Sequence, residues 1–358
     1  MKVGIFHSAF IGDLALCGLL IEGLYLEKHE IYLIVKKPSA ILYKNDTRLT
    51  NIISIQKKRG LKKLSSISHI ADEIKKLNLD VILVPHQSAT SAFSTFLSKI
   101  KKRISYNKNS FKFLYTELRE FNVKHHESVR CLDLAPEWLI SEKIRNELMR
   151  INRPILRPTD NLNSFLNKFP NFFKVHKYFF IVNPGSVWAT KKYPLEYLFS
   201  AVKTLMNMNI EIACIVSGGE QDKKDIEKFI ELLNSNKEIS ERIYNTLDCL
   251  PLNELVALTA RAQFIIANDS APLHIASGTN TPSIGIFGPT DWESGFAPAS
   301  EKNVVLSYKN ALNKSLSCQP CSKHGHKVCP QKHFRCMSDL KSNYLVDSVL
   351  ALVPEIFT

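Results

Sequence analysis

Four short polar segments of the chain carry residue types suited to group transfer, and each follows an apolar run. In the first, Asp13 comes directly after Ile11-Gly12. A carboxylate beside the free amides of a helix start can stay ionised and accept a proton from a sugar hydroxyl. The alternative is a purely structural cap, since Asp is among the best residues at that position and capping is its more frequent role there. Asp13 is therefore a candidate general base that needs support from the other segments.

The second segment combines a flexible glycine, two hydroxyls and two cations just before an expected helix. Gly185 allows close backbone approach, Ser186 and Thr190 offer hydroxyls, and Lys191 or Lys192 offers a positive charge. These are the components of a pyrophosphate site that needs no metal. A surface turn with solvated lysines is the alternative.

The third segment places Asp269 and Ser270 at the start of another expected helix, with His274 one turn further along. Capping explains Asp269 and Ser270. It does not explain the histidine, nor the nearby turn that begins at Gly288. We therefore interpret these four residues as donor-binding.

The fourth segment is a turn after a buried strand and contains Gly219, Glu220 and Asp222. Its acidic groups could hold sugar or ribose hydroxyls, or only form a turn and a helix cap. The chain has no Gly-x-Gly-x-x-Gly after its first strand and no Gly-x4-Gly-Lys-Ser/Thr. Both absences disfavour dehydrogenases and NTPases of the usual types.

Short apolar strands alternating with helices position these segments, and this order predicts an α/β fold with parallel sheets. Ligands bind at the carboxyl ends of strands in such sheets, which is where all four segments lie. We expect residues 111–149 to be mostly helical and 153–158 to be a linker. The expected strands are 2–7, 31–35, 81–84, 178–182, 210–217, 264–267 and 283–287.

The length of 358 residues predicts two domains, because it exceeds one ordinary core. We expect a first domain over 1–168, a second over 169–336 and a closing helix over 337–358. The opening residues are typical of a strand rather than a signal peptide, and no apolar run approaches the ~20 residues of a membrane span. These features predict a cytoplasmic protein.

Positive charge is concentrated in the first half. Residues 1–168 contain 28 Lys and Arg against 16 Asp and Glu, whereas residues 169–358 contain 19 against 18. Such an excess suits an anionic partner: a membrane surface, a phosphorylated glycolipid or nucleic acid. A solvated lysine-rich surface is the alternative. Nucleic acid is disfavoured because aromatic residues are not interleaved with the charges. The basic clusters are Lys57-Lys58-Arg59, Lys62-Lys63, Lys99 and Lys101-Lys102-Arg103.

Four of the eight cysteines are grouped near the end of the chain. Four thiolates can complete a closed tetrahedral zinc shell, but the seven- and six-residue gaps are irregular. Two interpretations stay open, a structural zinc ion or four unligated thiols, and either role is structural. The cysteines are Cys318, Cys321, Cys329 and Cys336, with His324, His326 and His333 as alternative ligands.

Taken in order, the motifs resemble glycosyltransferase family 9, the ADP-heptose:lipopolysaccharide heptosyltransferases. Gly12-Asp13 matches its N-terminal signature, and Pro184-Gly185-Ser186 with Lys191-Lys192-Tyr193-Pro194 is similar to its Gly-Ala-Ser and Lys-Arg-Trp-Pro elements. The stretch 268–276 and the turn 286–290 resemble its most specific segment. The grouped cysteines look like the heptosyltransferase II subgroup.

This resemblance implies a GT-B fold, with two Rossmann-like domains facing each other across a cleft. The first would bind the acceptor and the second the nucleotide sugar. It also implies an inverting transfer of heptose from ADP-L-glycero-β-D-manno-heptose to the lipopolysaccharide inner core. One alternative is a family 9 transferase that uses another nucleotide sugar or a capsule or glycoprotein acceptor. Another, from a different class, is a non-catalytic basic protein that binds membrane or nucleic acid.

By the same resemblance, Asp13 is the general base and Lys191 stabilises the leaving diphosphate, so that catalysis requires no metal. The acceptor would be the anionic lipopolysaccharide core at the inner face of the inner membrane, where the protein would lie peripherally. The residues assigned to donor binding are Gly185, Ser186, Thr190, Lys192, Gly219, Glu220, Asp222, Asp269, Ser270, His274 and Gly288.

Overall fold

The computed structural model describes residues 1–57 and 63–358, and it divides the chain into two compact units, Met1–Ile155 and Leu156–Thr358. The division falls within the expected linker rather than at residue 168. Its position has a physical reason, since Leu162 and Phe165 pack in an apolar core of the second unit.

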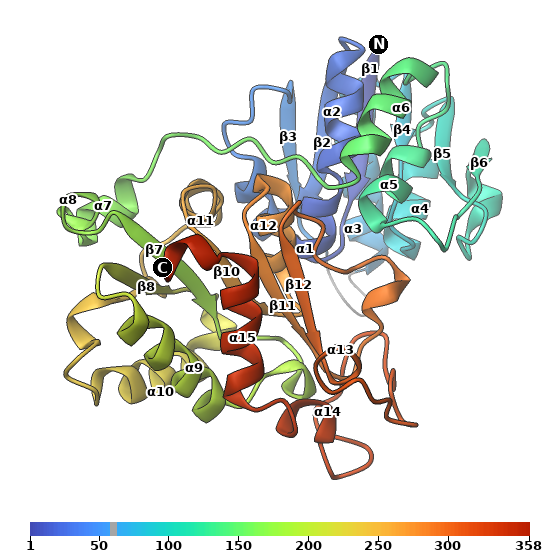
Figure 1. The fold of residues 1–358 in the computed structure, drawn as a ribbon. Coiled ribbons are helices and arrows are strands. Elements are labelled where there is room, and N and C mark those ends of the chain that lie inside the picture. Colours follow the sequence, from blue (N-terminus) through green and yellow to red (C-terminus); the bar gives the residue numbers. More distant parts are fainter. Residues whose placement is uncertain (58–62) are drawn as a thin grey trace. The chain divides into compact units, whose positions relative to one another are not determined.

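The first unit contains a parallel six-stranded sheet in the order β3-β2-β1-β4-β5-β6 (Figure 1). Successive strands are added on one side of β1 up to β3 and on its other side from β4 onward. The position between β1 and β4 is therefore a switch point, where open α/β sheets bind ligands. The strands are β1 (Lys2–His7), β2 (Glu30–Lys36), β3 (Asn51–Ile55), β4 (Val81–Leu83), β5 (Lys102–Tyr106) and β6 (Glu117–Arg119). The helices are α1 (Ile11–Leu16), α2 (Gly18–Leu26), η1 (Lys37–Tyr43), α3 (Lys63–Lys76), α4 (Ala89–Leu97), η3 (Lys112–Leu114), α5 (Glu127–Asp133) and α6 (Glu142–Ile151).

The second unit repeats this topology, with the order β12-β11-β10-β7-β8-β9 and its switch point between β7 and β10. The strands are β7 (Tyr178–Asn183), β8 (Ile212–Val216), β9 (Ile243–Asn245), β10 (Ile265–Asn268), β11 (Ser283–Phe287) and β12 (Asn303–Ser307). The longer helices are α9 (Leu195–Met208), α10 (Lys223–Asn234), α11 (Leu252–Thr259), α12 (Ala271–Thr279) and α15 (Ser342–Leu352). Shorter ones are α7 (Asn163–Lys168), α8 (Phe172–Val175), η4 (Ala189–Lys191), η5 (Glu220–Asp222), η6 (Ser240–Arg242), η7 (Trp292–Ser294), α13 (Tyr308–Leu312), α14 (Arg335–Ser338) and η8 (Pro354–Ile356).

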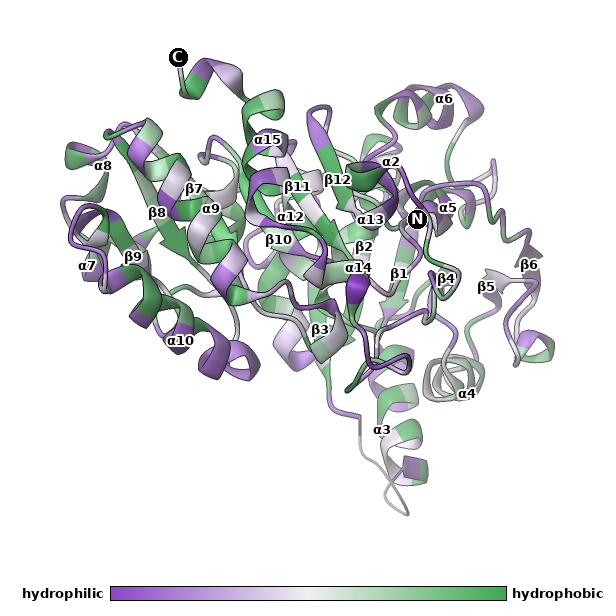
Figure 2. Cartoon of the chain, turned by 60° about the horizontal axis from the view of Figure 1, so that its bottom comes forward, coloured by the Kyte–Doolittle hydropathy of each residue, from purple (hydrophilic) through white to green (hydrophobic). Residues whose placement is uncertain are grey.

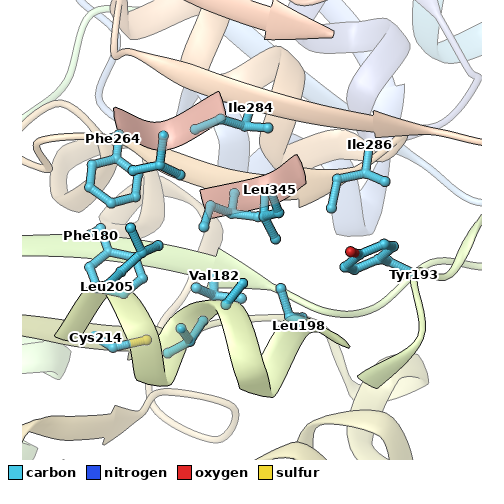
Figure 3. Packing of buried hydrophobic residues seen from close by; sticks show 14 of the residues in the cluster. Phe180, Val182, Tyr193, Leu198, Leu205, Cys214, Phe264, Ile284, Ile286 and Leu345 are labelled. Atoms are coloured by element: carbon cyan, nitrogen blue, oxygen red, sulfur yellow. The ribbon is translucent and has the colours of Figure 1, made fainter. Parts of the chain in front are cut away.

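Burial on both faces explains the uniformly apolar sequences of the central strands. Strand β8 is buried along its whole length, and Figure 2 shows it in hydrophobic colours. In the second unit, Phe180 and Phe264 stack with ring centroids 4.8 Å apart (Figure 3). Leu345 of α15 packs into the same core. The closing helix therefore belongs to the second unit, and it ends at Leu352 before a short 3-10 turn.

Residues 11–16 form helix α1, which places Asp13 in the first helical turn. One expectation about local structure was wrong. Residues 111–149 include strand β6 besides helices, because Ile104 to Tyr106 of β5 provide a free edge for pairing. Within the described residues, no helix combines the length and the apolar character that a membrane span requires.

Candidate functional site

Three side chains from three different loops meet at the carboxyl end of the second unit's sheet. The Lys191 ammonium lies 2.5 Å from the Asp269 carboxylate, and the Thr290 hydroxyl donates to the same carboxylate oxygen at 2.7 Å. The side chains of Lys191 and Asp269 are each 12% exposed. The loops follow β7, β10 and β11, so this network occupies the switch point between β7 and β10. It supplies a positioned cation of the kind that stabilises a diphosphate leaving group.

Two asparagines that end neighbouring strands hold these loops in place. Asn268, the last residue of β10, accepts from the Tyr193 amide at 3.1 Å and donates to the Pro184 carbonyl at 2.8 Å. Asn183, the last residue of β7, donates to the Ser217 carbonyl at 2.8 Å. Sequence reasoning assigned no role to either. The signal that could have found them is an apolar strand that ends in asparagine at each side of the switch point.

The Asp222 side chain packs against the backbone of Gly185 in the second polar segment. A Cβ atom at Gly185 would lie 2.2 Å from the Asp222 carboxyl carbon, so only glycine fits there. Asp222 is 5% exposed and accepts from the Gly219 amide at 3.1 Å, and burial raises the pKa of its carboxyl group. Glu220 beside it is exposed. In this arrangement Asp222 shapes the loop, while Glu220 is the acidic side chain open to solvent.

The other residues of the second segment have separate contacts. Lys192 forms an ion pair with Asp225 of α10 at 2.6 Å. The Thr190 hydroxyl accepts from the His326 amide at 2.7 Å, which ties it to the cysteine-containing tail. Ser186 is 7% exposed and lies in the loop between Gly185 and η4. Lys191 and Lys192 therefore differ although they are adjacent, since only Lys191 joins the network at the switch point.

The third segment forms the start of α12. Ser270 is the N-cap residue, but its hydroxyl donates to the Asn268 carbonyl at 3.1 Å and does not cap the helix. His274 is 5% exposed, and its ring centroid lies 6.4 Å from that of Phe296. At Gly288 a Cβ atom would lie 2.8 Å from the Met337 side chain. Gly288 thus lies against the tail, and a side chain there would displace the end of Met337.

Asp13 lies at the switch point of the first unit, just after β1. It is the third residue of α1, and its carboxylate accepts from the Phe10 amide at 3.4 Å. Through this long contact Asp13 takes part in capping α1, and only one of its two carboxylate oxygens is used. His7, which ends β1, and His86, which follows β4, lie beside it along the sheet edge, with ring centroids 5.9 Å apart.

Two lysines lie along the same edge. Lys36 ends β2, and its ammonium lies 5.6 Å from the Phe10 ring. Lys57 follows β3 and donates to the Ser88 hydroxyl at 2.9 Å. Burial, and then repulsion from Lys36 and Lys63, lower the pKa of Lys57 to about 8. Burial, and then nearby positive groups, lower the pKa of His86 to about 3, so His86 is neutral at pH 7. Of the predicted basic clusters, Lys58, Arg59 and Lys62 lie outside the described residues.

The four grouped cysteines line one small cavity together with His333. The Cys318 sulfur lies 3.8 Å from His333 Nε2. Burial, and then the other three cysteines, raise the pKa of Cys336 to about 12. Among the described residues, however, no three His, Cys, Asp or Glu side chains are placed to share a metal ion. The structure thus brings the cysteines together without the geometry of a formed metal site.

Residues 67–333 match the model of glycosyltransferase family 9 (heptosyltransferase). This match covers well over half of the chain. The chain belongs to glycosyltransferase family 9. The family resemblance inferred from the motifs is therefore confirmed.

Relatives within family 9 are similar over different lengths. A lipooligosaccharide heptosyltransferase 2 of Campylobacter jejuni is 28% identical over 172 residues, which are 48% of this chain and 50% of the relative. This chain therefore matches only about half the length of that relative. A lipopolysaccharide heptosyltransferase 1 of Campylobacter coli is 23% identical over 365 residues, covering 100% of this chain and 99% of the relative.

A solved structure confirms the fold of this family 9 member. The ADP-heptose lipopolysaccharide heptosyltransferase II of Escherichia coli superimposes with a TM-score of 0.75 at 16% identity, over 99% of each chain. Two parallel six-stranded sheets covered by helices are the architecture expected of a GT-B enzyme.

Proposed function

We propose that this chain is an inverting glycosyltransferase that moves heptose from ADP-L-glycero-β-D-manno-heptose to the inner core of lipopolysaccharide. Family 9 membership supports the reaction class. Relatives whose names specify heptosyltransferases of lipooligosaccharide and lipopolysaccharide support the sugar and the acceptor. The observation that carries the proposal is the network of Lys191, Asp269 and Thr290 at a switch point.

In this proposal the second unit binds the nucleotide sugar. Lys191 faces the diphosphate and neutralises the charge that develops on it as the bond to the anomeric carbon breaks. The Ala271 amide at the start of α12, which Ser270 leaves without a side-chain cap, favours the same negative charge. Asp269 holds Lys191 in position before the donor arrives. These groups supply the stabilisation without a catalytic metal.

The first unit binds the acceptor and provides the base. Asp13 takes the proton from the acceptor hydroxyl as its oxygen attacks the anomeric carbon from the face opposite the diphosphate, which inverts that centre. Lys36 and Lys57 along the same sheet edge attract the carboxylates and phosphates of the core. An acceptor of this kind is anchored in a membrane, so we place the protein in the cytoplasm, peripheral to the inner face of the inner membrane.

We also propose that the four grouped cysteines bind one structural zinc ion. Four thiolates that line one cavity can make a closed shell, and to do so these side chains would have to move closer together than they are in this structure. A bound metal would order the tail. The tail contacts Thr190 in the segment after β7 and Gly288 directly after β11. The metal would take no part in the transfer itself.

The test of the transferase is ADP release from ADP-heptose, with and without heptose-deficient lipopolysaccharide. Acceptor-dependent release is the expected result. If there is no turnover but calorimetry detects ADP binding, the donor sugar or the acceptor is wrong and the nucleotide site stands. Failure to bind any adenine nucleotide contradicts the proposal.

A further inference from the structure

We propose that the outer face of helix α4, together with η3, is the surface by which this protein docks on an anionic phospholipid bilayer. The inference deepens the proposed function, because it rests on an acceptor that is membrane-anchored. It names a surface remote in sequence from Asp13 and from the donor loops. We call it the α4 patch and define its apolar part as Phe93, Phe96, Leu97 and Phe113.

The solvent-exposed face of helix α4 is apolar, whereas the exposed face of a surface helix is usually polar. Phe93, Phe96 and Leu97 are 36%, 45% and 48% exposed. Their spacing of i, i+3 and i+4 places them in one stripe along the helix. The opposite face is buried and carries small polar residues, of which Ser94 donates to the Ile67 carbonyl of α3 at 3.1 Å. The helix is thus packed through hydroxyls and exposes its large apolar side chains.

The stripe continues onto η3 through aromatic contacts. The ring centroids of Phe93 and Phe111 lie 5.5 Å apart, and those of Phe111 and Phe113 lie 6.5 Å apart. Phe113 is 74% exposed. Three exposed phenylalanines joined into one surface are unusual for a soluble protein, and such patches mark interaction sites.

Basic side chains border these rings. The Arg103 guanidinium lies 5.6 Å from the Phe96 ring and donates to the Leu114 carbonyl of η3 at 3.0 Å, which links the two parts of the patch. Lys99 just after α4 and Lys112 in η3 are exposed. Residues 81–116 contain six Lys and Arg and no Asp or Glu. The α4 patch therefore combines apolar and cationic groups without a neighbouring acidic residue from its own segment.

This combination fits a bilayer with anionic headgroups better than a second protein. Phenylalanines can enter the boundary between headgroups and acyl chains, while Lys and Arg contact phosphates, and the two contributions add. A second copy of this chain would bring the same positive charges together, and like charges across an interface oppose association. Charge complementarity therefore selects the phospholipid surface.

The experiment is sedimentation of the full chain with vesicles that contain no lipopolysaccharide. One set contains phosphatidylcholine with about a third phosphatidylglycerol, and the other contains phosphatidylcholine alone. The wild-type chain is expected to bind the anionic vesicles and to lose most of this binding in high salt. The Phe96→Ser/Phe113→Ser variant is expected to bind the anionic vesicles at least about tenfold more weakly than the wild type.

A matched control exists in the second unit. Met208 and Ile210 are 47% and 78% exposed, close to the values for Phe96 and Phe113, and lie outside the patch. The Met208→Ser/Ile210→Ser variant is expected to bind vesicles as the wild type does. Equal binding by both double variants, or no preference of the wild type for anionic vesicles, overturns the proposal. So does self-association that disappears in the Phe96→Ser/Phe113→Ser variant while vesicle binding is unchanged.

Because the vesicles carry neither donor nor acceptor, this assay does not depend on transfer. Turnover of a deacylated, water-soluble acceptor by the Phe96→Ser/Phe113→Ser variant should equal that of the wild type, which also shows that the variant is folded. Normal turnover without vesicle binding by the wild type overturns only the α4 patch. Vesicle binding without any turnover leaves the patch standing and contradicts the transferase.

Discussion

The two switch points have the same strand order, but their lysines differ in whether they form ion pairs. In the second unit, each lysine beside β7 has a carboxylate partner, Asp269 for Lys191 and Asp225 for Lys192. In the first unit, Lys36 and Lys57 form no ion pair with an acidic side chain within the described residues, and Lys57 contacts only a neutral hydroxyl. One topology thus supports both a paired and an unpaired arrangement of cations.

This difference indicates how each sheet edge would interact with an anionic ligand. A lysine held by a carboxylate is positioned in advance, so little reorganisation is needed when a diphosphate arrives. Unpaired lysines that repel each other become more stable when an anion binds between them. The comparison therefore supports the proposed roles, a positioned catalytic charge in the second unit and an affinity for anions in the first.

The largest expected effect comes from the acid–base group of the first unit. Asp13→Asn removes the proton acceptor and keeps the size of the side chain, so kcat should fall by about 10³-fold. Calorimetry should show unchanged donor binding, because the residues proposed to bind the donor lie in the second unit. Asp72→Asn, at an exposed position of α3, is the charge-matched control and should be fully active. An active Asp13→Asn enzyme would reduce Asp13 to a helix-capping residue.

The next effect separates the two adjacent lysines of the second unit. Lys191→Ala should lower kcat/KM by about 10²-fold to 10³-fold, since it removes a cation from the leaving group and leaves Asp269 without its ion-pair partner. Lys192→Ala should cost less than about tenfold, because Lys192 is engaged with Asp225. Steady-state kinetics with ADP-heptose measure both. Equal losses would show that the pairing does not distinguish the two lysines.

A third prediction concerns the loop that carries these lysines. Gly185→Ala should lower the free energy of unfolding by about 1–3 kcal/mol, because the new methyl group meets the buried Asp222 carboxyl group. At Gly219 the nearest atoms belong to the end of the Gln221 side chain, which can move away. Gly219→Ala should therefore cost well under about 1 kcal/mol. Thermal or urea denaturation of the two variants tests this contrast.

The unpaired lysines predict a pH dependence of acceptor binding. The pKa of Lys57 is lowered to about 8 in the folded chain, so the side chain loses its charge as pH rises through 8. The KM for an anionic acceptor should rise several-fold between pH 7 and 9. Lys57→Arg keeps its charge and should flatten this rise. A KM that does not change in the wild type would exclude Lys57 from acceptor binding.

The same lowered pKa has a consequence for stability. Because the unfolded chain binds a proton to Lys57 up to its ordinary pKa of 10.5, protonation favours the unfolded state, and the contribution of Lys57 to stability rises between pH 8 and 10.5. Lys57→Met should remove this contribution. Denaturation at pH 8 and pH 10 compares the two proteins.

The smallest expected effect on turnover comes from the cysteine-containing tail. Anaerobically purified protein is expected to carry about one zinc ion per chain, and Cys321→Ser should lose the metal and melt at a lower temperature while ADP binding is retained. Elemental analysis measures the first and differential scanning calorimetry the second. Protein without zinc or iron would leave the cysteines as unligated thiols.

Much of the fold could be predicted because its signals are local. An apolar strand followed by Gly, Pro, Asn or Asp identifies both a buried strand and the loop after it, and β1, β7 and β11 were predicted to within a residue. The strands that were not predicted are β3, β5, β6, β9 and β12. Four of them lie at sheet edges, where one side of the strand lacks a neighbour, and β5 begins with the charged pair Lys102-Arg103. Their sequences alone did not distinguish them from loops.

The candidate site shows the same limit. Sequence motifs identified Lys191 and Asp269 separately, 78 residues apart, but not their contact. Asn183 and Asn268 were overlooked, because a hydrogen bond across adjacent strands has no signature within either strand. The sequence analysis made no prediction about which face of α4 is exposed, and only the packing of Ser94 against α3 shows it.

By itself the sequence determined the α/β class, the division into two halves, the charge asymmetry and the family, since each depends on composition or on short runs of residues. Only the tertiary structure decided which charges are paired, which aspartate supports a loop and which helix face is exposed. The physical reason is that strand order brings distant loops together at a switch point, and the energy of a charge or an apolar ring depends on the neighbours it meets there.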